Sequence, residues 1–152
     1  MNSIRTAVYA GLLAGTIDIG AASAINAAAP DRVLRAVASG LLGRAAAHGG
    51  AWVPVLGMFL QWAMSIIIAG VFLAAAAKAP ILLRRWIPAG IAYGVIIFFV
   101  MNYVVVPLSA AVFKVHFSPL SFAENMAAML LFGLIVAYVG RRGDAAADVR
   151  GK

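Results

Sequence analysis

The chain has 152 residues, of which 64% are hydrophobic and only 11% are charged, and its mean hydropathy is +1.00. This balance excludes an ordinary soluble domain, and the absence of cysteine excludes disulfides, thiolate catalysis and cysteine-ligated metal sites. The net charge of +7 does not indicate nucleic-acid binding, because the Lys and Arg residues lie at the ends of long apolar blocks. We expect an integral membrane protein that contacts the lipid bilayer and binds no nucleic acid.

Four apolar blocks predict four transmembrane helices, packed as one all-α bundle. The predicted spans are residues 6–28, 53–77, 87–106 and 120–139. Each has about 20 residues, enough at about 1.5 Å per residue to cross a hydrocarbon layer about 30 Å thick. Residues 140–152 are rich in Ala, Gly and charge and are predicted to form a disordered cytoplasmic tail.

The first span imitates a cleavable signal peptide, because a basic N-terminus and an apolar stretch precede the small residues at 27–29. Asp18 lies in the middle of that stretch. Since a charge there is unusual in a signal peptide, we favour a retained transmembrane helix.

Small and polar residues recur three or four apart in the first two spans, so they share one helix face. These stripes are Gly11, Gly15, Asp18, Ala22 and Asn26 in the first span, and Gly57, Gln61, Ser65 and Ala69 in the second. Close backbone approach and interhelical hydrogen bonds hold helices together in lipid, so we predict that both stripes face the bundle interior.

Asp18 is the most informative residue, because an ionised carboxylate near the bilayer centre costs about 2.5–3.5 kcal/mol on insertion scales. It is either protonated or placed among polar groups or water. One interpretation is a proton carrier or a cation ligand. The other is a structural hydrogen bond to Gln61, Ser65 or Asn102, and both interpretations stay open.

Between the first two spans, apolar side chains recur at helical spacing in a segment too polar to cross the membrane. We predict an amphipathic helix over about residues 31–47 in a periplasmic loop, with Asp31 as N-cap. Its basic residues, Arg35 among them, would face headgroups or water. The helix would act as a packed lid or as a gate.

The third span begins with Gly90 and Gly94, a further pair of small residues spaced for helix packing. The pattern at residues 10–15 recurs at residues 89–94. This hints at a duplicated two-helix unit of the kind found in some transporters, although generic packing is the simpler explanation.

Further polar residues lie in the predicted outer half: Asn26, Asn102, His116, Glu124 and Asn125. They could form a vestibule open to the periplasm. The alternative is that Glu124 and Asn125 serve the first turn of the fourth helix, with Ser121 as its cap.

Basic residues set the predicted orientation. Eight of them lie at the N-terminus, in the second loop and in the tail, against four in the first and third loops. The excess places both termini in the cytoplasm of a cell with an inner membrane.

Three stretches of the chain resemble an uncharacterised family of small bacterial four-helix membrane proteins, and more distantly the YagU-type inner-membrane proteins. They are residues 32–43, residues 100–109 and residues 124–126. The resemblance implies the topology and a bacterial origin, but no catalytic residue or substrate.

No catalytic or nucleotide-binding motif is found, and only His48 and His116 could ligate haem or metal, so we expect no cofactor, no metal and no enzyme activity. The leading hypothesis is an accessory or scaffold component that packs against itself or a larger membrane complex. The alternative is a proton or small-solute transporter or channel subunit working as a homo-oligomer. An intramembrane enzyme using Glu124 and His116 ranks last.

Overall fold

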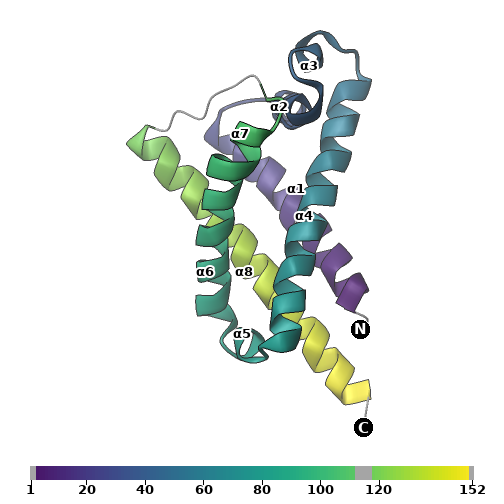
Figure 1. Ribbon diagram of the computed structural model, residues 1–152, viewed down its shortest axis with the longest axis vertical. Helices are drawn as coiled ribbons and strands as arrows, with labels where there is room; N and C mark the ends of the chain where they lie inside the picture. The colour runs from purple at the N-terminus through teal and green to yellow at the C-terminus, as the bar shows by residue number, and fades with distance from the viewer. Residues whose placement is uncertain (1–2, 112–117, 151–152) are drawn as a thin grey trace.

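The computed structural model describes residues 3–111 and 118–150, and the side chains of residues 4–111 and 118–144. Within this part of the chain the fold is all helical, and four segments are long and apolar enough to cross a membrane. They are α1 (Ser3–Ile25), α4 (Trp52–Lys78), α6 (Trp86–Val100) with its continuation to Leu108, and α8 (Pro119–Arg150). Both termini lie at the same end of the bundle (Figure 1). The predicted number of membrane-length helices is therefore confirmed.

The long helices pack as two hairpins, which are joined by contact between the first helix, α1, and the last, α8. Helix α1 packs against α4, α6 packs against α8, and α1 also packs against α8. The central cluster consists mainly of small and aromatic side chains: Ala10, Ala14, Ala69, Phe72, Phe132, Val136, Ala137 and Val139. Helices α4 and α6 are joined by Tyr93, whose hydroxyl donates to the Ile68 carbonyl oxygen at 2.6 Å. Side chains from all four long helices thus meet in one bundle.

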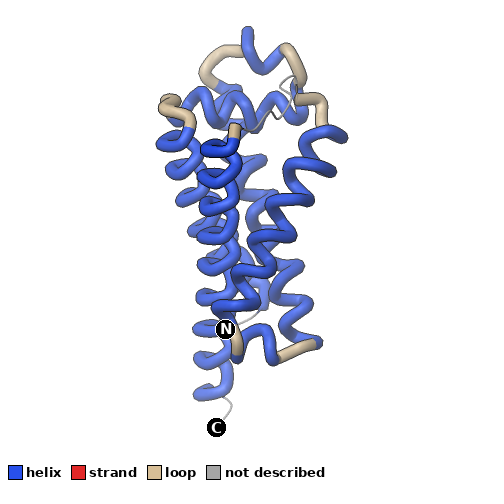
Figure 2. Tube along the Cα trace, turned by 90° about the vertical axis from the view of Figure 1, so that its left-hand side faces the viewer, coloured by secondary structure: helices blue, strands red, loops and turns tan. Residues whose placement is uncertain are grey.

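Two short helices, α2 (Pro30–Leu42) and α3 (Ala45–His48), lie across the end opposite the termini (Figure 2). The single helix predicted there is broken at Gly43, which has a φ of +57° that favours glycine. The predicted N-cap Asp31 is wrong: Ala29 is the N-cap, Pro30 opens the helix and Asp31 lies in its first turn. Proline suits this position because its φ is already helical and it has no N–H to leave unpaired.

Helix α2 is packed tightly onto the bundle. The Leu34 backbone lies so close to Gly57 of α4 that a Cβ on this glycine would collide with it. Beyond α6, the Ala110 N–H donates to the Gly40 carbonyl oxygen at 2.9 Å. These contacts favour the packed-lid interpretation of this segment.

The prediction that Arg35 faces headgroups or water is wrong, because its side chain reaches the backbone of α3 and of the two glycines that follow. Its guanidinium is partly buried and donates to the carbonyl oxygen of Gly49 at 2.7 Å, and to those of Ala46 and Gly50 at 3.4 Å. These carbonyls lie at or just beyond the end of α3, where backbone acceptors lack helical partners. Arg35 therefore pins α3 to α2.

Helix α6 widens near its end into a π-helical turn, η1 (Met101–Val105), before α7 (Val106–Leu108). The Val106 N–H donates to the Met101 carbonyl oxygen, five residues earlier. Pro107 explains the change, because it has no N–H to donate and its ring would clash with the carbonyl four residues before it.

Both ends of α8 differ from the sequence predictions. At its start the cap is Ser118 and not Ser121, since the Ser121 N–H donates to the Ser118 Oγ at 3.1 Å. At its other end the helix runs to Arg150 through the segment predicted to be disordered. Gly140 packs against Leu73 and Gly143 against Thr6, so contacts with α4 and α1 continue past residue 139. The alanines that follow are strong helix formers.

Helix α5 (Ile81–Arg84) turns the chain between α4 and α6.

Candidate functional site

The polar stripes of the first two spans meet at the interface between α1 and α4. A Cβ at Gly11 would lie 2.5 Å from the Ile66 Cα, and one at Gly15 would lie 2.5 Å from the Ser65 Oγ. Only glycine permits such close backbones, as the small-residue spacing indicated. Ser65 is correspondingly buried, with 2% of its surface exposed.

One turn further along this interface, Asp18 and Gln61 are directly bonded. The Gln61 Nε2 donates to the Asp18 Oδ2 at 2.8 Å. Asp18 is only partly buried, and no hydrogen bond to its Oδ1 is found among the described residues. The pair fits the structural alternative for Asp18, while its second oxygen leaves one acceptor free for a proton, water or cation.

A second polar link lies on the same interface. The Trp62 indole N–H donates to the Thr16 Oγ1 at 3.2 Å, and the Thr16 hydroxyl donates to the Leu12 carbonyl oxygen at 2.7 Å. The prediction from small-residue spacing missed this link because Thr16 lies off the predicted stripe. Polar side chains thus join α1 to α4 at two levels.

The outer-half amides do not gather into a shared site. Each side-chain amide donates to the carbonyl oxygen four residues earlier in the chain: Asn26 to Ala22 at 2.7 Å, Asn102 to Phe98 at 2.8 Å and Asn125 to Ser121 at 2.7 Å. Glu124 is partly buried, and its side chain makes no hydrogen bond or ion pair with another described residue. His116 and Lys114 lie outside the described residues. The structure therefore brings Asp18, Gln61 and Ser65 to one interface, but gives no bond from Asn102 or Glu124 to them.

The remaining packing glycines serve other contacts. Gly57 was predicted to belong to the α4 stripe, but it packs against the Leu34 backbone of α2. A Cβ at Gly94 would lie 2.5 Å from the Met129 carbonyl oxygen of α8, and one at Gly90 would lie 2.9 Å from the Gly133 carbonyl oxygen of that helix. Gly133 was missed, although it is the one glycine within the fourth predicted span and could have been singled out there.

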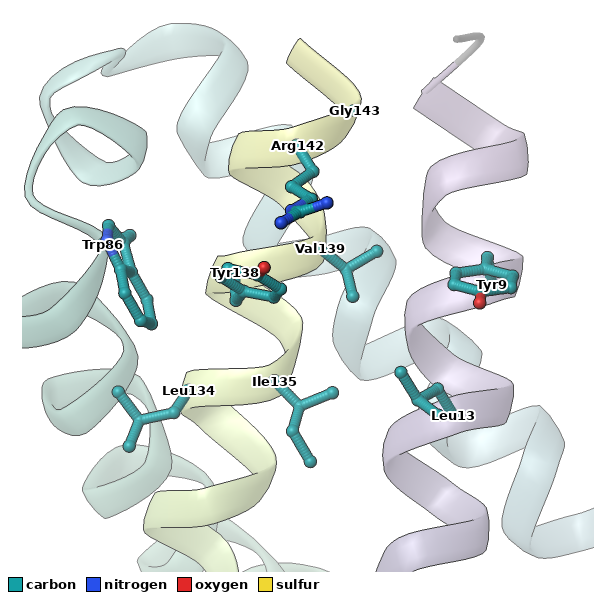
Figure 3. Close-up of a pocket in the computed structure, with 9 residues that line it drawn as sticks. All are labelled: Tyr9, Leu13, Trp86, Leu134, Ile135, Tyr138, Val139, Arg142 and Gly143. Atoms are coloured by element: carbon teal, nitrogen blue, oxygen red, sulfur yellow. The ribbon is translucent and has the colours of Figure 1, made fainter. Parts of the chain in front are cut away.

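A groove opens on the outer face of the bundle at the end that holds the termini (Figure 3). It has a volume of about 530 Å³ and is lined by Tyr9, Leu13, Trp86, Leu134, Ile135, Tyr138, Val139, Arg142 and Gly143. Trp86 and Tyr138 are aromatic residues of the kind that prefer membrane interfaces. The sequence could not show that α6 and α8 bring these two rings into contact.

Comparisons with protein-family models, curated proteins and solved structures find no match to this chain. The candidate sites therefore rest on the geometry of this chain alone.

Proposed function

We propose that this protein is an accessory or scaffold component of a bacterial inner membrane, acting by contact with another membrane protein and without catalysis of its own. The bond between Asp18 and Gln61 carries the proposal. Asp18, the acid in the middle of the first predicted span, is thus used to join two helices of the same chain, as expected of a structural bundle.

The packing glycines support the same conclusion. Gly11, Gly90 and Gly94 each pack against another helix of this chain. The bundle thus satisfies its own close-packing positions. What it leaves outward is large apolar side chains such as Phe59, with 62% of its surface exposed, and Phe99, with 46% exposed. A partner in the membrane would bind to these exposed apolar side chains.

Both termini in the cytoplasm, and α2 and α3 on the periplasmic side, belong to the same proposal. Support comes from the excess of basic residues at the end of the bundle that holds the termini and α5. The resemblance to small bacterial four-helix proteins supports the inner-membrane assignment and stays a proposal with it.

Photo-crosslinking in the native membrane tests the partner. A photoreactive phenylalanine analogue would replace one exposed residue on each long helix: Tyr9, Phe59, Phe99 and Leu131. The matched control is Phe98, which is fully buried beside Phe99. We expect a discrete adduct with a different protein from at least one exposed position and none from Phe98. Lipid adducts alone at all four positions would contradict the proposal.

The second candidate is proton or cation transport by a homo-oligomer, and it is favoured by the Asp18 Oδ1, which accepts no hydrogen bond from the described residues. Asp18→Asn keeps an oxygen that can accept from Gln61, so it should preserve the fold while removing the ionisable group. Abolished flux in liposomes with an intact fold would establish transport. Equal flux in liposomes with the wild type, in liposomes with the variant and in empty liposomes would exclude transport by this protein.

A further inference from the structure

The groove of about 530 Å³ beside the termini divides along its length into two chemically different parts. Arg142, Tyr138 and Trp86 lie toward one end, and Leu13, Leu134 and Ile135 lie toward the other (Figure 3). Its volume falls within the range of about 300–1,000 Å³ typical of small-molecule sites. An occupant must therefore match a polar aromatic end and an aliphatic end.

Arg142 supplies the charge of the polar end. Its guanidinium carbon lies 5.1 Å from the centre of the Tyr138 ring, and the Tyr138 and Trp86 rings are 5.4 Å apart. No Asp or Glu lines the groove, and among the described side chains Arg142 makes no ion pair. This cation is held in place by an aromatic ring, and its hydrogen-bond donors are available to an anion.

The surroundings reinforce the positive charge. Arg5, Arg84, Arg85 and Arg141 are all exposed on elements at the same end of the bundle. Basic pockets between transmembrane helices favour anionic lipid headgroups, and aromatic rings prefer the level of those headgroups.

We propose that the groove is a binding site for one anionic phospholipid. The phosphate lies at Arg142 beside Trp86 and Tyr138, and an acyl chain lies against Leu13, Leu134 and Ile135. Only an amphiphile satisfies both ends of the groove at once. This site depends on the chain spanning a membrane and is independent of the accessory role.

Trp86 is a built-in reporter of occupancy. The chain has three tryptophans, so Trp52→Phe with Trp62→Phe leaves Trp86 alone. This protein is reconstituted in phosphatidylcholine containing a minor fraction of brominated phosphatidylglycerol or, separately, of brominated phosphatidylcholine. The test variant is Arg142→Gln. The control is Arg141→Gln, which removes the same charge from the adjacent exposed residue outside the groove.

We expect the brominated anionic lipid to quench Trp86 with about fivefold higher apparent affinity than the brominated zwitterionic lipid, in the reporter protein and in Arg141→Gln. Arg142→Gln should reduce this preference to near unity. Equal losses in both variants, or no preference in the reporter protein, would overturn the proposal.

Native mass spectrometry of the full wild-type chain is the second measurement, in case the tryptophan substitutions disturb the fold. Retained phosphatidylglycerol that is lost in Arg142→Gln but not in Arg141→Gln would support the site. Equal retention in both variants would overturn it.

Discussion

Asp18 illustrates how far residue-level reasoning reaches in this protein. Its intramembrane position predicted either a structural bond or a carrier, and the structure supplies a bond from one of the three predicted partners, Gln61. Spacing alone could place both residues on inward faces, but it could not fix the relative rotation of α1 and α4. That rotation also decides the Trp62–Thr16 bond, which the sequence did not predict.

A double-mutant cycle measures the Asp18–Gln61 link. Asp18→Ala and Gln61→Ala should couple by about 0.6 kcal/mol, and at most about 1.7 kcal/mol, in the free energy of unfolding in lipid bicelles. The control cycle pairs Asp18→Ala with Asn102→Ala, whose amide bonds to its own helix, and should show no coupling. Similar coupling in the two cycles would contradict a direct bond.

Arg35 gives a second prediction at this scale. Arg35→Ala removes the charged donor from the carbonyls at the end of α3, and hydrogen bonds to charged groups are worth about 1.5–3 kcal/mol. We expect hydrogen exchange of residues 45–50 to accelerate by about tenfold or more. Arg32→Ala, at an exposed position of the same helix, should leave the exchange rate unchanged. Equal exchange rates of residues 45–50 in the two variants would contradict the role of Arg35 in capping α3.

At the scale of elements, the two hairpins use one packing device. Gly11 and Gly15 let α1 approach α4, and Gly90 and Gly94 let α6 approach α8. The recurring sequence pattern marks this common role, which helix packing explains without a duplication. The elements that the sequence misjudged depend on contacts or on single backbone angles: the break at Gly43, the π-helical turn before Pro107 and the helical continuation past residue 139.

Gly133 tests the α6–α8 interface. A side chain there would meet the backbone of Gly90 and Gly94. Gly133→Leu should therefore destabilise the bundle by about 1–3 kcal/mol or more, since that range is typical of overpacking. Gly70→Leu is the control, because a Cβ there meets nothing within 4 Å, and it should be neutral or slightly stabilising. Thermal unfolding in detergent compares them. Equal transition temperatures would show that Gly133 is not a packing position.

On the scale of the whole molecule, helix number and apolar length followed from the sequence because apolar runs of membrane length have few alternatives in water. The groove did not, since it combines residues far apart in the chain. The structure places both termini at one end, with α2 and α3 at the other, and the four membrane-length helices account for the shared end of the termini.

The absence of cysteine makes the proposed orientation easy to test. Ala47→Cys, exposed in α3, should react with a membrane-impermeant maleimide in intact cells. Arg84→Cys, exposed in α5 at the opposite end, should react only after the membrane is permeabilised. The reverse pattern would invert the proposed topology.

The accessory role is tested most directly by the mass and composition of the complex extracted gently from its native membrane into lipid nanodiscs. The account predicts a different membrane protein in fixed stoichiometry with this chain, retained after washing. A single chain, or a homo-oligomer accompanied only by lipid, would contradict it and make the Asp18→Asn flux assay decisive.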